Sequence, residues 1–203
     1  MTKGTLYVIS AASGAGKTSL VSAVLERVPD VEVSVSHTTR APREGEVDGV
    51  NYHFVDMDRF EAMVEAGDFF ESAQVFGNMY GTSRQHIQER LLKGKDVILE
   101  IDWQGARQIR QLMADCKSIY VAPPSIATLR ERLISRAQDD EAVIDKRMKE
   151  AVSEMSHYAE FEYLVINDDF DEACDNLSAI IVAERMLLVH QQHKHAGLLA
   201  ELL

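Results

Sequence analysis

Residues 10–18 combine glycine, lysine and hydroxyl side chains at a spacing that suits the binding of phosphate. They read Ser-Ala-Ala-Ser-Gly-Ala-Gly-Lys-Thr, with a short apolar run at 6–9 before them and an apolar-periodic stretch at 20–28 after them. A strand, a glycine-containing loop, Lys-Thr and a helix in this order are the layout of a P-loop. We therefore predict a phosphate-binding loop here. The alternative is a chance glycine-rich turn, which the position between strand and helix disfavours.

Each residue type in this loop has a chemical reason to be there. Gly14 and Gly16 let backbone N–H groups turn inward and contact phosphate oxygens. Lys17 places a compact positive charge near the outer phosphates of a nucleotide, and the hydroxyl of Thr18 is a ligand for Mg²⁺. The N-terminus of the following helix adds a partial positive charge.

Acidic residues end a second apolar run. Residues 96–102 read Asp-Val-Ile-Leu-Glu-Ile-Asp. An acid-x-acid ending of a parallel strand places carboxylates at the edge of the sheet where ligands bind. We expect Asp102 to hold the water molecules around Mg²⁺ and Glu100 to reach a base or an arginine. The alternative is that these acids cap the helix that follows.

Two arginines lie three residues apart around a proline in the loop at 36–46. Arg40 and Arg43 suit the bidentate capture of a phosphate group. Two solvated surface arginines would produce the same pattern, and this segment alone does not decide between the two interpretations.

The segment after that loop carries a carboxylate and a phenol. Glu71 follows Phe70, and Tyr80 lies in the stretch Gly-Asn-Met-Tyr-Gly-Thr-Ser at 77–83. A buried Glu71 would accept hydrogen bonds from the edge of a base, and Tyr80 would present its hydroxyl to a phosphate. Taken alone, Glu71 is more typical of an exposed strand position.

Three arginines in the second half of the chain suit phosphoryl transfer. Arg132 and Arg136 lie four residues apart on one predicted helix face, and Arg147 lies on the next predicted helix. Phosphoryl transfer needs positive charge on the migrating group, and arginines on a closing lid supply it. Ordinary helix surface charge is the alternative, because Glu131 and Asp145 are nearby.

Strands and helices alternate along most of the chain, and this alternation predicts the framework that positions these groups. The predicted strands are 5–9, 31–36, 97–101, 118–121 and 163–166. The predicted helices are 17–28, 57–66, about Ser83 to Gly94, 104–113, 125–136, 141–159 and 171–190. Parallel strands joined by helical crossovers follow from this order, so we predict an α/β fold with a parallel sheet flanked by helices.

Residues from about 34 to 90 interrupt the alternation. Short strands at 68–76 and a turn at Gly77 and Asn78 predict an inserted segment with local β-structure. A second polar stretch, 136–141, lies between two predicted helices and suits a mobile lid.

The composition is that of an ordinary globular protein, with 46% hydrophobic and 27% charged residues among 203. The formal net charge of −12 argues against a general binder of nucleic acid or of an anionic membrane. Cys116 and Cys174 have no metal-site spacing, which predicts two reduced cysteines and a cytoplasmic protein. We find no signal-peptide run at the N-terminus and no stretch of the roughly 18–20 apolar residues that a membrane span needs.

Taken together and in this order, these segments resemble the guanylate kinase family of nucleoside monophosphate kinases. The resemblance covers nearly the whole chain. Its Thr-Thr-Arg-x-Pro-Arg and Asp-x-Gln-Gly segments are more specific than the P-loop. The matching motifs are Ser13 to Lys17, Ser36 to Arg43, Gly77 to Thr82, Ile101 to Gly105 and Val165 to Asp169.

The resemblance implies transfer of the γ-phosphoryl group of ATP to GMP, with Mg²⁺ bound to ATP, in purine nucleotide metabolism. It implies that ATP is bound by Ser13, Gly14, Ala15, Gly16, Lys17, Thr18, Ser19 and, beside the adenine, Asn167. It implies that GMP is bound by Ser36, Glu71 and Thr82 at the guanine, by Arg40, Arg43, Tyr52 and Tyr80 at the phosphate, and by Glu100 beside the base. The implied catalytic charges are Lys17, Arg132, Arg136 and Arg147, and the implied metal ligands are Thr18 and, through water, Asp102.

The family fold is a P-loop NTPase core with an inserted GMP-binding domain and a lid. By resemblance we expect the core at 1–33, 91–125 and 149–203, the GMP-binding domain at 34–90 and the lid at 126–148. ATP and GMP are the expected partners, without nucleic acid or membrane, and a homo-oligomer is left open.

Three residues depart from the family pattern. Ala11 replaces the first glycine of the P-loop, so we expect that turn to accommodate a Cβ. Glu100 stands where Asp is usual and is one methylene longer beside the base. Ala137 stands where Gly is usual, so we expect a stiffer lid hinge.

Two other functions stay open. A related kinase acting on a ribose bisphosphate would need the P-loop and the arginines but no base-reading Ser36, Glu71 and Thr82. A non-catalytic guanylate-kinase-like module that binds proteins would need neither Lys17 nor Thr18, and their presence argues against it.

Overall fold

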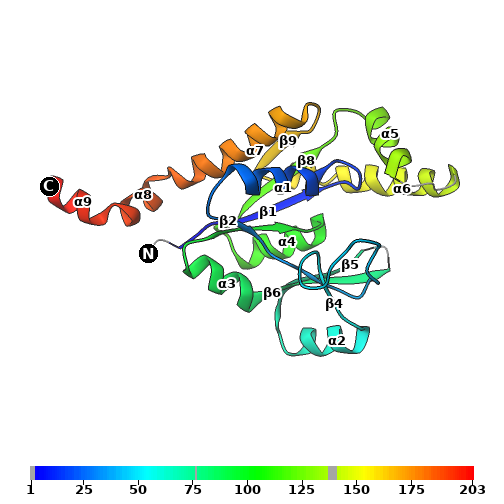
Figure 1. Cartoon of the computed structure of the whole chain (residues 1–203), viewed down its shortest axis with the longest axis horizontal. Coiled ribbons are helices and arrows are strands. Elements are labelled where there is room, and N and C mark those ends of the chain that lie inside the picture. The colour runs from blue at the N-terminus through cyan, green and yellow to red at the C-terminus, as the bar shows by residue number, and fades with distance from the viewer. Residues whose placement is uncertain (1–2, 76, 137–140) are drawn as a thin grey trace.

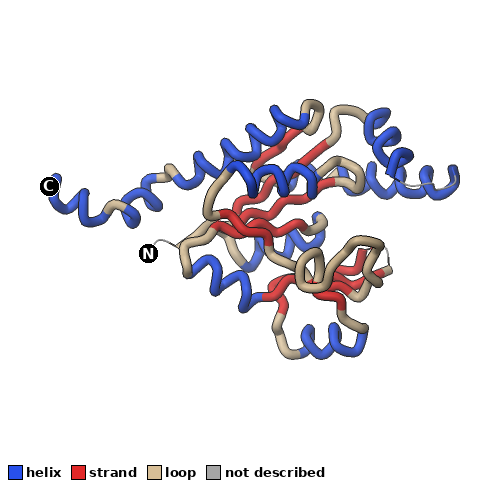
Figure 2. The backbone as a smooth tube through the Cα atoms, in the orientation of Figure 1, coloured by secondary structure: helices blue, strands red, loops and turns tan. Residues whose placement is uncertain are grey.

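A five-stranded parallel sheet forms the centre of the molecule (Figure 1, Figure 2). The computed structural model describes residues 3–75, 77–136 and 141–203. The strand order is β2-β7-β1-β8-β9, and each neighbouring pair is parallel. The bounds are β1 Leu6–Ala11, β2 Val31–Val33, β7 Asp96–Glu100, β8 Lys117–Ala122 and β9 Tyr163–Ile166. The predicted α/β fold with a parallel sheet is therefore confirmed.

Helices cover both faces of this sheet (Figure 1). Tyr7 and Ile9 of β1 pack in an apolar cluster with α1 (Lys17–Arg27) and α7 (Phe170–Arg185). Leu6 and Val8 of the same strand pack on the opposite side with α3 (Arg84–Leu92) and α4 (Trp103–Leu112). Side chains of a strand alternate between two faces, and here both faces are buried, so β1 reads as one apolar run.

A four-stranded sheet with the order β4-β3-β6-β5 lies beside this core (Figure 1). Its bounds are β3 His37–Thr38, β4 His53–Phe54, β5 Phe69–Val75 and β6 Asn78–Ser83. The helix α2 (Met57–Glu65) packs on it through Phe60, which meets Phe69 of β5. The local β-structure predicted for the insertion is therefore present. The strand β6 ends at Ser83 and α3 begins at the next residue. Ile87 and Leu91 of α3 pack in the same apolar cluster as Leu6 and Val8, so the chain returns to the core with α3.

Two helices, α5 (Ile126–Arg136) and α6 (Glu141–Met155), lie past the ends of the central strands (Figure 1). Leu129 and Leu133 of α5 and Met148 of α6 form one apolar cluster with Ala12. Because Ala12 belongs to the predicted P-loop, this helix pair is packed directly against that loop. The 3₁₀ turn η1 (Tyr158–Glu160) follows α6.

Three predicted elements are shorter than expected. The strand predicted at 31–36 ends at Val33, because the chain leaves the central sheet there to reach β3. The helix predicted at 141–159 ends at Met155 and the 3₁₀ turn takes its place. The helix predicted at 171–190 ends at Arg185, one residue after its last buried side chain, Glu184.

Two short helices, α8 (Leu188–Lys194) and α9 (Ala196–Leu202), follow α7 and extend away from the core (Figure 1). Neither contains a buried residue. None of the helices in the described ranges is long and apolar enough to cross a membrane. Cys116 and Cys174 are buried free thiols, as the sequence predicted.

We expect Arg185→Ala to lower the free energy of unfolding by about 2–3 kcal/mol, because it leaves a buried carboxylate unpaired. Asp96 accepts hydrogen bonds from Arg185 Nε at 2.8 Å and from the backbone N–H of Thr5 at 2.6 Å. Its side chain is 6% exposed. Urea unfolding measures the loss. The control is Asp175→Ala, whose 76% exposed carboxylate pairs with Arg27 and should cost less than about 1 kcal/mol. Equal losses would show that burial of the Asp96 pair adds nothing.

Candidate active site

At two positions, the loop between β1 and α1 has a backbone conformation that glycine adopts readily. Gly14 and Gly16 have φ angles of 90° and 93°, where a side chain is strained. A Cβ on Gly16 would lie 2.4 Å from Nδ2 of Asn167, and a Cβ on Gly14 would lie 3.0 Å from Cδ2 of Leu133. The turn predicted for a P-loop is therefore formed, and its neighbours leave no room for side chains at these two positions.

Ala11 does not lie in that turn. It is the last residue of β1, and Asp30 is the one non-glycine residue with a positive φ among the described residues. Ala11 is therefore extended and its Cβ causes no strain. The expectation that the turn must accommodate a Cβ here is wrong, because the turn begins one residue later.

Lys17 reaches from the start of α1 to the end of β7. Its Nζ donates a hydrogen bond to the carbonyl of Ile101 at 3.2 Å. Burial lowers the pKa of Lys17, and the charges of Glu100, Asp102 and Glu154 act in the opposite direction. The charges of three carboxylates, one at the end of β7, one at the N-cap of α4 and one on α6, therefore favour the charged form of the amine.

Glu100 lies between the P-loop and the second sheet. The hydroxyl of Thr18 donates a hydrogen bond to Glu100 Oε2 at 2.9 Å. Burial raises the pKa of Tyr52, and the charges of Tyr80 and Glu100 add to this effect. Glu100 thus contacts the predicted metal ligand Thr18 directly and acts on the predicted phosphate-binding phenol of Tyr52 through space.

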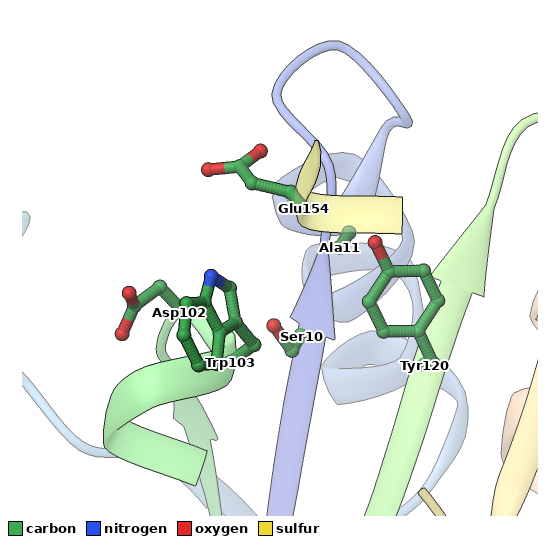
Figure 3. Close-up of a pocket in the computed structure, with 6 residues that line it drawn as sticks. All are labelled: Ser10, Ala11, Asp102, Trp103, Tyr120 and Glu154. Atoms are coloured by element: carbon green, nitrogen blue, oxygen red, sulfur yellow. The ribbon is translucent and has the colours of Figure 1, made fainter. Parts of the chain in front are cut away.

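Asp102 is the N-cap of α4. Its Oδ1 accepts a hydrogen bond from the backbone N–H of Gly105 at 2.9 Å, and its Oδ2 accepts one from Gln104 Nε2 at 2.9 Å. The capping alternative raised from the sequence is thus observed for Asp102. Figure 3 shows the same side chain in a crevice with Trp103 and Glu154, beside the end of β1.

Glu71 is buried, with 3% of its surface exposed. It accepts a hydrogen bond from the hydroxyl of Thr82, whose oxygen lies 3.3 Å from Ser36 Oγ. Burial raises the pKa of Glu71 to about 7, against the lowering effect of the Thr82 hydrogen bond. A Cβ on Gly105 would lie 2.7 Å from Glu71 Oε2, so α4 approaches this carboxylate closely. The three predicted guanine contacts are brought together, and the exposed-strand interpretation of Glu71 is wrong.

Arg40 is held by an acid that the sequence analysis did not single out. Its Nη2 lies 2.8 Å from Oε1 of Glu46, and the backbone N–H of Arg43 donates to Oε2 of the same carboxylate at 2.7 Å. The Arg40 guanidinium also lies 5.4 Å from the ring centre of Tyr52, which is 5.9 Å from that of Tyr80. Three of the four predicted phosphate-binding residues, Arg40, Tyr52 and Tyr80, therefore lie in one cluster. Arg43 contacts Glu46 through its backbone, and its side chain is exposed.

Arg132 of α5 is joined to the P-loop through Asn167. Arg132 Nη2 donates to the carbonyl of Asn167 at 3.0 Å, and Asn167 Nδ2 donates to the carbonyl of Ala15 at 2.8 Å. Arg132 Nη1 is buried and has no hydrogen-bond partner within the described part of the chain. Asn167 is 4% exposed, and its amide supports the backbone of the loop.

The remaining predicted lid residues are described in part. Arg147 lies on α6 and is half-buried. Arg136 ends α5, and its side chain lies outside the described residues, as does Ala137 with its predicted hinge. Ser19 is exposed on the first turn of α1.

Glu154 is a second acid that the sequence analysis missed. Its Oε2 accepts a hydrogen bond from the backbone N–H of Ser13 at 3.0 Å. A signal was available: Glu154 follows Arg147 by seven residues, which places both on one face of a helix.

The site combines a phosphate loop with two positive-φ glycines, acids at the end of the neighbouring parallel strand, and an arginine connected to the loop through Asn167. This combination defines a nucleotide-binding phosphotransferase of the P-loop class. The guanylate kinase family model matches residues 3–184, and the chain belongs to the guanylate kinase family.

Relatives and a solved structure agree with this assignment. The chain is 60% identical to the guanylate kinase of Alkalilimnicola ehrlichii, over 98% of each chain. It is 58% identical to the guanylate kinase of Pseudomonas fluorescens, over 98% of this chain and 97% of the relative. The crystal structure of guanylate kinase from Anaplasma phagocytophilum superimposes with a TM-score of 0.77 at 35% identity, covering 93% of this chain and 89% of that one.

The raised pKa of Glu71 predicts how Glu71→Gln changes stability with pH. An acid whose pKa is higher in the folded protein binds protons more tightly when folded, so its contribution to stability falls as pH rises. That fall spans the interval from 4.5, its usual value, to about 7. Without substrate, we expect the melting temperature of Glu71→Gln relative to the parent to be higher at pH 8 than at pH 5. Thermal unfolding at the two pH values measures this, and a difference that does not change with pH would refute it.

Proposed function

We propose that this protein transfers the γ-phosphoryl group of ATP to GMP and gives ADP and GDP. The observation that carries the proposal is the buried carboxylate of Glu71, grouped with the hydroxyls of Thr82 and Ser36. This group is connected to the P-loop side of the molecule through the first turn of α4. Membership of the guanylate kinase family supports the same reaction.

The Glu71 group suits guanine for a chemical reason. Guanine presents N1–H and the N2 amine as adjacent donors, and a carboxylate accepts both in parallel. Adenine presents an acceptor at N1 and would leave a buried carboxylate unpaired, which is a strong ground for rejection. The hydroxyls of Ser36 and Thr82 donate or accept, so they refine the choice.

The Arg40 cluster suits the phosphate of GMP. Guanidinium groups bind phosphate in a bidentate manner, and phenol hydroxyls add single donors. Glu46 accepts hydrogen bonds from both the Arg40 guanidinium and the Arg43 backbone, so the loop is shaped before substrate arrives. Tyr52 and Tyr80 complete this proposed subsite.

The P-loop and the arginines beyond it suit the phosphates of ATP. In phosphoryl transfer the protein mainly positions the reactants and stabilises charge. We assign that stabilisation to Lys17 and to Arg132, Arg136 and Arg147, and we assign no general base. The unpaired buried Nη1 of Arg132 supports this role, because a buried guanidinium N–H without an acceptor is costly and a phosphate oxygen supplies one.

The donor set beside Lys17 fits Mg²⁺. Thr18, Glu100 and Asp102 offer hydroxyl and carboxylate oxygens, which are the ligands this ion prefers, directly or through water. Bound there with ATP, the ion would neutralise charge on the phosphate oxygens. Glu100 is placed here in addition to its proposed approach to GMP, because its carboxylate contacts Thr18.

We further propose a cytoplasmic enzyme of purine nucleotide metabolism that binds neither nucleic acid nor membrane. The net charge of −12 and the buried free thiols support this setting. The limits of the GMP-binding domain at 34–90 and of the lid at 126–148 remain proposals, as does a homo-oligomer.

The two alternatives fit the site less well. A ribose bisphosphate kinase would have no use for a buried Glu71 with two hydroxyls beside it. A protein-binding module would have no use for an amine held among three carboxylates at a P-loop.

A coupled assay of ADP release tests the proposed reaction. With ATP we expect turnover of GMP, and a kcat/KM lower by about 10⁴ for AMP, UMP and ribose 1,5-bisphosphate. Lys17→Ala should lower kcat by about 10²–10³, the cost of losing one transition-state charge contact, and should leave the melting temperature nearly unchanged. Preference for another acceptor would overturn the proposal, and a fully active Lys17→Ala would remove the role of the P-loop.

The pKa of about 7 for Glu71 also predicts the pH dependence of GMP use. A protonated carboxyl cannot accept both guanine donors, so kcat/KM for GMP should fall as pH drops below about 7. The GMP phosphate titrates in the same range, and Glu71→Gln separates the two effects because it removes only the carboxyl. We expect the variant to be slower at pH 8 and to lose less activity between pH 8 and pH 6. If the pH profile of kcat/KM were the same in Glu71→Gln and in the parent, the titration would belong to the GMP phosphate alone.

A further inference from the structure

The last turn of α6 is hydrogen-bonded to the P-loop through the side chain of Glu154, in addition to the apolar packing of Met148 against Ala12. Figure 3 shows Glu154 at the end of α6, with its carboxylate beside the loop that follows β1. Oε2 accepts a hydrogen bond from the backbone N–H of Ser13 at 3.0 Å. The two residues are 141 positions apart in sequence, so this bond fixes one distant element to another.

A carboxylate is an unfavourable choice at this position unless it does something specific. The loop has to receive a polyanionic nucleotide, and a negative charge beside it repels that ligand. Burial raises the pKa of Glu154, because removing its charge from water costs free energy. The Ser13 hydrogen bond and the charge of Lys17 lower the pKa. An apolar side chain would avoid both costs but would not bind the Ser13 N–H.

The same face of α6 carries Arg147 seven residues earlier. Two turns of an α-helix separate the two residues by about 10 Å along the axis. Glu154 is therefore the point at which α6 is hydrogen-bonded to the P-loop, and Arg147 lies two helical turns away from that point. A tilt of about 10° at Glu154 would move Arg147 by about 2 Å over that length. Displacements of this size are enough to cost a large part of a catalytic rate.

The end of α6 is fixed a second time just beyond Glu154. His157 stacks on Trp103 of α4 with ring centres 3.6 Å apart and an interplanar angle of 7°. Glu160 pairs with Arg107 and Arg110 of α4. The stack and the ion pairs hold the chain to the core but do not reach the P-loop. Glu154 alone among the described contacts of α6 ties the helix to the loop by a hydrogen bond.

We propose that Glu154 is a positioning residue, whose hydrogen bond to Ser13 sets α6 relative to the P-loop so that Arg147 meets the transferred phosphoryl group. This inference rests on the proposed function, because it assigns Arg147 to that reaction. Glu154 acts through Arg147 and touches no reacting atom.

Three variants test it first. Glu154→Ala removes the bond, and Glu154→Gln removes the charge but keeps an oxygen that accepts from the Ser13 N–H. Glu150→Ala, one turn earlier on the same helix, controls for the loss of a nearby carboxylate. For Glu154→Ala we expect kcat to fall about 10–100-fold with KM for GMP within about twofold of the parent. The kcat of Glu154→Gln should stay within about threefold of that of the parent. The kcat of Glu150→Ala should also stay within about threefold of that of the parent.

A double-mutant cycle with Arg147→Ala tests the route of the effect. If Glu154 acts through Arg147, the double variant loses no more kcat than Arg147→Ala alone. Additive losses would overturn the proposal. A Glu154→Gln as impaired as Glu154→Ala would also overturn it, because the role would then belong to the charge. A lower melting temperature with unchanged kcat would reduce Glu154 to a structural contact.

The amide proton of Ser13 gives a readout independent of catalysis. In NMR spectra of the isotope-labelled parent we expect a downfield, slowly exchanging resonance, which moves upfield and exchanges faster in Glu154→Ala and changes little in Glu154→Gln. If the parent failed to phosphorylate GMP, the proposed function would fall while this resonance still reported the bond. An amide unaffected by Glu154→Ala would overturn the positioning proposal by itself.

Discussion

The shape of one backbone turn determines where everything else in the site must lie. A phosphate loop turns its N–H groups inward, so it satisfies few of its own hydrogen bonds and needs contacts from outside. Here Asn167 binds the carbonyl of Ala15, and Glu154 binds the N–H of Ser13. Both supports come from the last third of the chain. The loop near the N-terminus is therefore completed only when β9 and α6 are in place, which ties phosphate binding to folding of the whole core.

Charge in the site is arranged for ligands rather than for stability. The carboxylate of Glu71 is desolvated, with the hydroxyl of Thr82 as its hydrogen-bond donor, and burial raises its pKa to about 7. Arg132 Nη1 is buried without an acceptor among the described residues. A binding site that must pair strongly with donors and anions has to keep such groups uncompensated, and it lowers stability to do so. Under the proposed function, Glu71 pairs with the guanine and Arg132 with the transferred phosphoryl group.

Much of this could be predicted from the sequence, and the parts that could not share a physical cause. The P-loop, the acid-ended strand and the alternation of elements are local patterns, and residue type and spacing specify them directly. Glu71 taken alone favoured an exposed position, because its burial depends on α4, a different element whose Gly105 lies against the carboxylate. Glu46 and Glu154 were missed because an acid on a loop or helix resembles a solvated surface charge until its distant backbone partner is known. The error about Ala11 concerned where a strand ends, which sequence determines only to within a residue or two.

The first turns of α4 join the two halves of the site. Gly105 lies against the Glu71 carboxylate, and its N–H is held by Asp102, which lies near Lys17. One turn later, Gln108 makes two hydrogen bonds to the backbone of Ser72 in β5, at 3.2 Å and 2.9 Å. The distance from the Glu71 carboxylate to the phosphate loop is thus set by a helix packed on the central sheet. Under the proposed function, a helix that is packed on the core therefore sets the spacing between the guanine of GMP and the phosphates of ATP.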